Sequence, residues 1–176
     1  MSGPVGDGTD RRELLGAAAA AVGGALVTAS GASGAARRDV EFLREAVALE
    51  QRLALAFATA AVPRPLAAQS RLFARHAREH AATLTASLRR RGGNPTPPAA
   101  RGPRAFPPAL LRLEEEAVGF YHRALGELRD TRLILFMASA MTGHAQQLVV
   151  LRQALGREPL PHAFESGRTP AALQLG

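Results

Sequence analysis

The 176-residue chain contains no cysteine and no lysine. Without thiols it can form no disulfide, no thiolate zinc site, no cysteine nucleophile and no lipid-modified cysteine anchor. All 22 basic residues are arginine, and only 5% of the residues are aromatic. Scarce aromatic side chains argue against a surface on which bases stack, so we expect no nucleic-acid partner despite the net charge of +7.

Motifs of hydrolases and phosphate binders are also missing. Neither Ser70 nor Ser87 lies in a nucleophile-elbow context, and no glycine-rich loop suits a phosphate group. Any chemistry must therefore come from other polar residues.

The first 36 residues have the pattern of an export signal. The pair Arg11-Arg12 precedes an apolar stretch of 14 residues, Leu14 to Val27, and small residues follow up to Ala36. This stretch is shorter than the roughly 20 apolar residues of a membrane span. The paired arginines resemble twin-arginine signals, which implies export to the periplasm, the cell wall or the medium, typically of an already folded protein. An ordinary secretory signal is the alternative, and an uncleaved segment would tether the protein to the membrane.

The rest of the chain is large enough for one domain, which we assign to residues 37–167 with a tail at 168–176. The first 36 residues hold two arginines and three acidic residues, so they carry −1 and the rest carries +8. Apolar residues at helical spacing predict four helices and no convincing strand. The helices are expected at about 39–60, 66–91, 107–128 and 131–155.

The connections between these helices predict their arrangement. The first and second helices are separated by about five residues and the third and fourth by fewer, so each pair is expected to form an antiparallel hairpin. The link between the hairpins has about 15 residues and could reach on the order of 50 Å, and the stretch 94–108 contains six prolines, which exclude regular structure in the link. This reach exceeds the length of a 22-residue helix, about 33 Å. We therefore expect an all-α, antiparallel four-helix bundle, ferritin-like, with a long crossover between helices two and three.

The two hairpins also look like copies of one unit. A shift of 64 residues brings Glu50 onto Glu114, His80 onto His144 and Gly92 onto Gly156.

Each of the four helices carries one polar residue within its apolar stripe, either a glutamate (Glu50, Glu114) or a histidine (His80, His144). A buried carboxylate must be paired, protonated or bound to metal, because burying it alone costs several kcal/mol. Oxygen and imidazole ligands suit iron, manganese or zinc. Any one of these residues, taken alone, is more often an ordinary core residue. The recurrence of all four at matching places favours a metal site.

The chain resembles the exported ferritin-like proteins of bacteria with a general ferritin-like domain, over about residues 39–167. Leu49-Glu50 with Phe57, and Leu113-Glu114 with Tyr121, resemble the family's Leu-Glu-aromatic pattern in helices one and three. The segments 76–80 and 144–147 resemble its Glu-x-x-His motif in helices two and four. The resemblance implies a metal centre inside the bundle.

Both bridging carboxylates of that motif are replaced, by Ala77 and His144. Without them two divalent ions would repel one another with little to offset the repulsion, so an active di-iron oxidase is not expected. We expect at most one divalent ion, of iron, manganese or zinc, and no catalytic residue is assigned. The candidate ligands are Glu50, His80, Glu114, His144, His76 and Gln147.

The alternative is a metal-free structural or interaction module, in which each glutamate is paired with a protonated histidine. One further point stays open, because His144 either replaces the family's glutamate or mirrors His80. Glu79 is expected to point outward and is a poor ligand candidate. An outer helical face could pair two copies as a homodimer, and the residues name no other protein partner.

Overall fold

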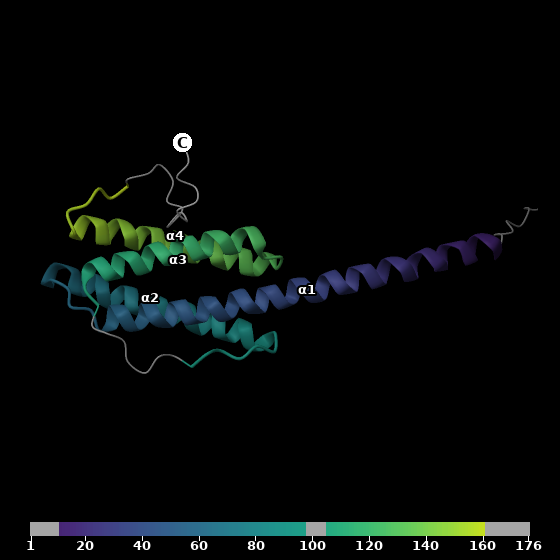
Figure 1. The fold of residues 1–176 in the computed structure, drawn as a ribbon, viewed down its shortest axis with the longest axis horizontal. Coiled ribbons are helices and arrows are strands. Elements are labelled where there is room, and N and C mark those ends of the chain that lie inside the picture. Colours follow the sequence, from purple (N-terminus) through teal and green to yellow (C-terminus); the bar gives the residue numbers. More distant parts are fainter. Residues whose placement is uncertain (1–10, 98–104, 161–176) are drawn as a thin grey trace, which may run out of the picture. The chain divides into compact units, whose positions relative to one another are not determined.

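The computed structural model describes residues 11–97 and 105–160, without the side chains of 11–33 and 35. It contains four helices: α1 (Arg11–Ala58), α2 (Arg64–Arg90), α3 (Pro107–Glu127) and α4 (Thr131–Ala154) (Figure 1). No strand occurs in these residues. The expected all-α class with four helices is confirmed, whereas the domain end at 167 and the tail at 168–176 lie outside the described residues.

The start of α1 differs from the expectation. The helix begins at Arg11 and not near residue 39. The segment between contains no proline and has five successive alanines at 17–21, the residue with the highest helix propensity. The chain divides into two compact units, Met1–Arg37 and Arg38–Gly176. The second unit contains the four-helix core.

Several of the other helix ends have proline or glycine at positions typical of such ends. Proline occupies the first turn of both α2 and α3, where a missing N–H costs nothing. Gly92 and Gly156 follow the ends of α2 and α4 with φ of 75° and 66°, a backbone conformation that favours glycine. The Asp130 carboxylate accepts hydrogen bonds from the backbone N–H groups of Arg132 and Leu133 and so caps α4.

One apolar core is shared by the four helices. Aromatic pairs join neighbouring helices, with ring centroids 5.4 Å apart for Phe57 and Phe73 and 6.1 Å apart for Phe42 and Phe120. Most of the large apolar residues that recur at helical spacing are buried, which agrees with the predicted helices. The largest fully buried apolar side chains are Leu43, Leu53, Leu84, Leu88, Leu110, Leu111, Tyr121, Met137, Leu148 and Leu151.

Hydrogen bonds and an ion pair at the helix ends join the connecting segments to one another and to neighbouring helices. The backbone N–H of Arg129, between α3 and α4, donates to Asp39 Oδ1 in α1 at 3.4 Å. Arg91, at the end of α2, forms an ion pair with Asp130 in the same α3–α4 connection. At another point, the N–H of Ala61 after α1 donates to the carbonyl of Ala105 before α3 at 2.9 Å.

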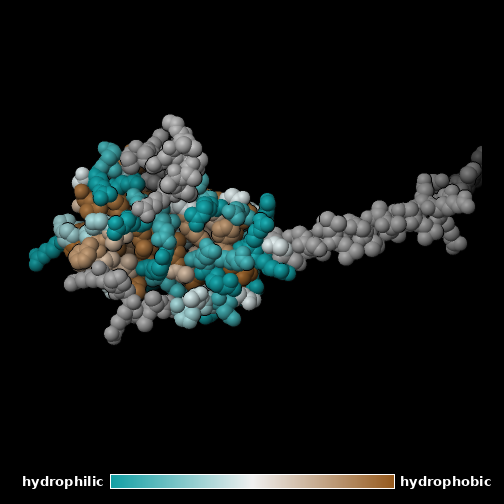
Figure 2. Space-filling view, viewed as in Figure 1, coloured by the Kyte–Doolittle hydropathy of each residue, from teal (hydrophilic) through white to brown (hydrophobic). Residues whose placement is uncertain are grey.

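Helix α4 is also long and apolar enough to cross a membrane by length and composition, and no other helix of the described part is. This criterion is weak for α4, because core helices of ordinary globular domains meet it too. On the face of the four-helix unit seen in Figure 2, hydrophilic residues are interspersed with apolar ones.

Candidate metal centre

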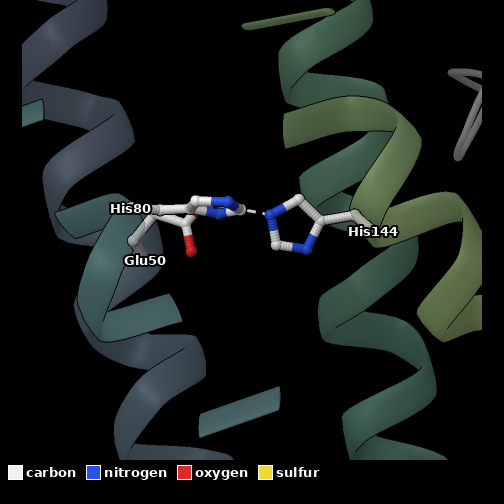
Figure 3. A group of neighbouring side chains, drawn as sticks. All are labelled: Glu50, His80 and His144. Atoms are coloured by element: carbon white, nitrogen blue, oxygen red, sulfur yellow. Dashed lines mark hydrogen bonds and ion pairs between the residues drawn. The ribbon is translucent and has the colours of Figure 1, made fainter. Parts of the chain in front are cut away.

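The four polar residues that interrupt the apolar stripes come together inside the core. Glu50 on α1 and Glu114 on α3 have no exposed surface, and His144 on α4 is 1% exposed. The side chain of His80 on α2 is 25% exposed. Figure 3 shows Glu50 and His80 pointing from neighbouring helices toward His144 on the other side. The predicted convergence of these side chains is thus observed.

Glu50 receives three donors on one oxygen. Its Oε1 atom lies 3.1 Å from His80 Nδ1, 3.0 Å from His144 Nε2 and 2.5 Å from the hydroxyl of Tyr121, which donates to it. The ring of Tyr121 also stacks on His144, with centroids 5.4 Å apart and planes 14° from parallel. One carboxylate therefore ties together side chains from all four helices.

His144 bridges the two carboxylates. Its Nδ1 atom lies 2.7 Å from Glu114 Oε2, and its Nε2 atom faces Glu50. Glu114 and His144 are 30 residues apart, as are Glu50 and His80, and both histidines use Nδ1. The geometry follows the alignment in which His144 mirrors His80.

These contacts shift the acid–base behaviour of Glu50 and His144 in opposite directions. Burial raises the pKa of Glu50, but hydrogen bonds and charge from His144 and His80 outweigh it and lower the pKa from 4.5 to about 2. Burial lowers the pKa of His144, but Glu114 and Glu50 outweigh it and raise the pKa from 6.5 to about 10. In the metal-free protein at neutral pH, an ionised Glu50 therefore faces an imidazolium.

Glu114 and Tyr121 hold their protons more strongly than usual. Burial raises the pKa of Glu114, and the charge of His144 offsets only part of the increase. Burial, followed by the charge of Glu50, raises the pKa of the Tyr121 hydroxyl well above 10. The hydroxyl thus remains a hydrogen-bond donor at physiological pH.

The cluster meets two requirements of a metal site. Glu50, His80 and His144 each offer one ligand atom, and these three atoms lie within 4.8 Å of one another. Two carboxylate oxygens, Glu50 Oε2 and Glu114 Oε1, are buried without a hydrogen-bond partner. A buried carboxylate oxygen without a partner is costly, and a cation beside Glu50 would remove that cost there. One carboxylate and two imidazoles are also a donor set that suits iron, manganese or zinc.

The remaining predicted ligands lie beside this group. Glu114 contacts His144 and does not join the three-residue group. His76 and Gln147 line a hollow that also includes His80. Glu79 is exposed, as expected, and lies at the same hollow.

Sequence reasoning missed the role of Tyr121, which it treated only as the aromatic residue of a pattern. The internal repeat could have indicated this role. Tyr121 corresponds to Phe57, and the two differ by one hydroxyl. A tyrosine at one of two equivalent buried positions indicates that its hydroxyl has a hydrogen-bonding partner there.

Comparison of the chain with protein-family models, with curated proteins and with solved structures gave no match. The function proposed below therefore depends on the geometry of this cluster.

Proposed function

We propose that the chain is an exported ferritin-like protein that binds a single divalent metal ion through Glu50, His80 and His144. The observation that carries this proposal is the state of Glu50. Its carboxylate is fully buried, two imidazoles from other helices meet it, and one of its oxygens has no partner. Apolar cores exclude such a carboxylate unless something compensates its charge.

The ferritin-like helix order is part of the proposal, and contacts at the helix ends support it. Asp39 near the start of the packed part of α1 and Arg91 at the end of α2 both contact the α3–α4 connection. Ala61 after α1 is bonded to Ala105 before α3. The packed part of α1 thus begins, and α2 ends, near the point where α3 ends and α4 begins. Helices α1 and α4 therefore run in one direction, and α2 and α3 run in the opposite direction. The 16-residue link from 91 to 106 must then return along α2, as in a bundle with one crossover.

Within this site Glu114 acts on His144 and not on the metal. A histidine that binds metal through one ring nitrogen commonly donates its other N–H to a carboxylate, which fixes the ring and makes it a better ligand. Glu114 Oε2 lies 2.7 Å from His144 Nδ1, on the ring side opposite Glu50. Tyr121 positions Glu50 in the same way, through its hydroxyl.

The bound ion would supply Lewis acidity and, for iron or manganese, redox chemistry. The residues around it would hold it in a dry core, because three of the four converging side chains are almost fully buried. Export is proposed from the Arg11-Arg12 pair and the apolar stretch after it.

A second candidate function is a metal-free structural module, and one observation favours it. Both ring nitrogens of His144 face carboxylate oxygens, and its pKa is raised to about 10. A protonated His144 could therefore compensate Glu50 without any metal.

Metal content and thermal stability separate the two candidates. Purified protein is assayed for metal by elemental analysis, then melted with and without added iron, manganese or zinc. We expect about one ion per chain and a higher melting temperature with the bound metal, because a ligand of the native state stabilises it. Glu50→Gln should lose both effects. Glu45→Gln, an exposed carboxylate on the same helix, should keep them.

If the purified protein contains no metal and added ions do not change its melting temperature, only the structural module remains as a candidate function. A content near two ions per chain would also overturn the single-ion proposal. Glu114→Gln refines the result, since loss of a carboxylate behind a ligand histidine is expected to weaken metal affinity about 10- to 100-fold without abolishing it.

A further inference from the structure

A polar hollow of about 460 Å³ lies between α2 and α4, next to the proposed metal centre. Helix α4 packs closely along α3 but meets α2 at few points, which leaves room for it. His80 belongs to both the hollow and the centre, and it is the one member of the metal-binding group with appreciable exposure. The hollow therefore borders the centre where the centre comes nearest to solvent.

The lining of the hollow is rich in groups that bind cations. His76 and His80 lie one turn apart on α2, and Gln147 faces them from α4. Gln147 is only 5% exposed as a residue, and it lines the hollow with a side chain whose amide oxygen is a neutral cation ligand.

Charge distinguishes this hollow from two others on the same unit. A hollow along α3 is lined by two arginines and two glutamates, and one at the end of α2 by three arginines and one aspartate, so arginine contributes to both. No arginine lines the hollow beside His80, although all of the chain's basic residues are arginines. Its one charged lining residue is Glu79, whose carboxylate lies 4.0 Å from Arg75, both largely exposed. In a chain of net charge +7, this is a place that a cation can approach.

We propose that this hollow is the access site through which a hydrated divalent cation reaches the centre. His76 and Glu79 take up the ion at the surface, Gln147 accepts it through its amide oxygen, and His80 passes it to Glu50 and His144. This inference rests on the proposed metal-binding function. It adds a second, weaker site whose role is the rate of loading and not the final affinity.

Gly143 allows the hollow to be filled without removing any ligand. It lines the hollow, and a Cβ atom added at this position meets nothing within 4 Å. Gly143→Leu should fill the space, and the α4 helix should tolerate it because glycine is the weaker helix former. Gly126→Leu is the matched control, since Gly126 is also helical with open space around it and lies outside the hollow.

The experiment measures how fast and how tightly metal-free protein takes up Co²⁺, followed by visible absorption after rapid mixing and by equilibrium titration. We expect Gly143→Leu and His76→Ala to load about tenfold more slowly than the native chain while their dissociation constants stay within about twofold. Gly126→Leu and His122→Ala, an exposed histidine on α3, should load like the native chain.

Unchanged loading rates in both hollow variants would overturn the access site while leaving metal binding intact. A dissociation constant that rises in parallel with the loss of rate would also overturn it, because His76 would then belong to the centre itself. Native protein that binds no Co²⁺ would instead reject the metal-binding function on which the access site depends.

Discussion

The two halves of the four-helix unit have equivalent geometry but different electrostatics. In each half a glutamate meets the Nδ1 atom of a histidine 30 residues later. Glu50 in the first half receives three donors and has its pKa lowered to about 2. Glu114 in the second half meets one histidine, and burial raises its pKa.

Two halves with equivalent side-chain positions can therefore hold their carboxyl groups in different charge states. Those states depend on which groups reach each carboxyl group: His144 and His80 together lower the pKa of Glu50, whereas burial outweighs the effect of His144 at Glu114. His144 adds to the asymmetry because it lies within hydrogen-bonding distance of both glutamates, whereas His80 does so only for Glu50. One half thus provides an ionised ligand and the other a carboxyl group that supports a ligand.

The largest expected effect comes from removing each carboxylate in turn from the metal-free protein. Glu50→Gln should destabilise the fold by about 3–5 kcal/mol, because it breaks a buried ion pair and leaves His144 with less compensation. Glu114→Gln should cost less, about 1–3 kcal/mol, because its carboxyl group has one hydrogen-bonding partner. Urea unfolding measures both values. Equal losses would mean that the two halves are electrostatically equivalent after all.

The pH dependence of stability should separate the halves next. Glu50 has a lowered pKa, so its contribution is present above pH 4.5 and is lost as the pH falls toward about 2. His144 has a raised pKa, so its contribution is present below pH 6.5 and is lost as the pH rises toward about 10. The alkaline loss should be easy to observe, since the chain has no lysine and one tyrosine.

Melting temperatures of chelator-treated protein across this range check the prediction. Glu50→Gln should flatten mainly the acid side. Glu114→Gln should reduce the alkaline side, because Glu114 is the largest cause that raises the pKa of His144. The prediction would be contradicted if each variant lowered the melting temperature by the same amount at every pH.

A smaller effect is expected where the halves differ by one hydroxyl. Tyr121→Phe should cost about 1 kcal/mol, because Glu50 loses one of three donors and keeps two. Phe57→Tyr places a hydroxyl at the equivalent position in the other half, where Glu114 has an oxygen without a partner. We expect the second change to be neutral or stabilising by up to about 1 kcal/mol, as measured by denaturant unfolding. A large loss from Phe57→Tyr would show that the repeat does not extend to this pair.

The smallest effect should be the same in both halves. Gly92→Ala and Gly156→Ala each force a side chain into positive φ, with open space around the new Cβ atom. Each should cost roughly 1–2 kcal/mol of backbone strain, with no change in metal affinity. The two variants should lower the melting temperature by similar amounts. A marked difference would indicate that the two helix ends are packed differently.

The helix pattern and the burial of the site residues could be predicted from the sequence, because they depend on local rules. The expected bounds of α2, α3 and α4 lie within two residues of the observed ones. The spacing of the apolar residues was enough to predict that Glu50, Glu114 and His144 lie in the core. The start of α1 could not be predicted, since an alanine-rich stretch suits an export signal and a helix equally well.

The contacts within the site were beyond sequence reasoning. Which oxygen of Glu50 receives the donors, and which histidine bridges both carboxylates, depend on helix rotation and depth at the scale of an ångström. The same limit applies to Gln147, which the sequence offered as a ligand and which lines the hollow beside His80. Pairwise spacing in the sequence carries no information of that kind.

The bridge formed by His144 also constrains how the helices can slide past one another. Moving α4 by one turn, about 5.4 Å, would withdraw the imidazolium from both glutamates and strand like charges in an apolar interior. We therefore expect the network to destabilise arrangements in which α4 is shifted along its axis, although contacts between leucines alone would permit them. A core made only of interchangeable aliphatic side chains would lack that means of selecting a single alignment.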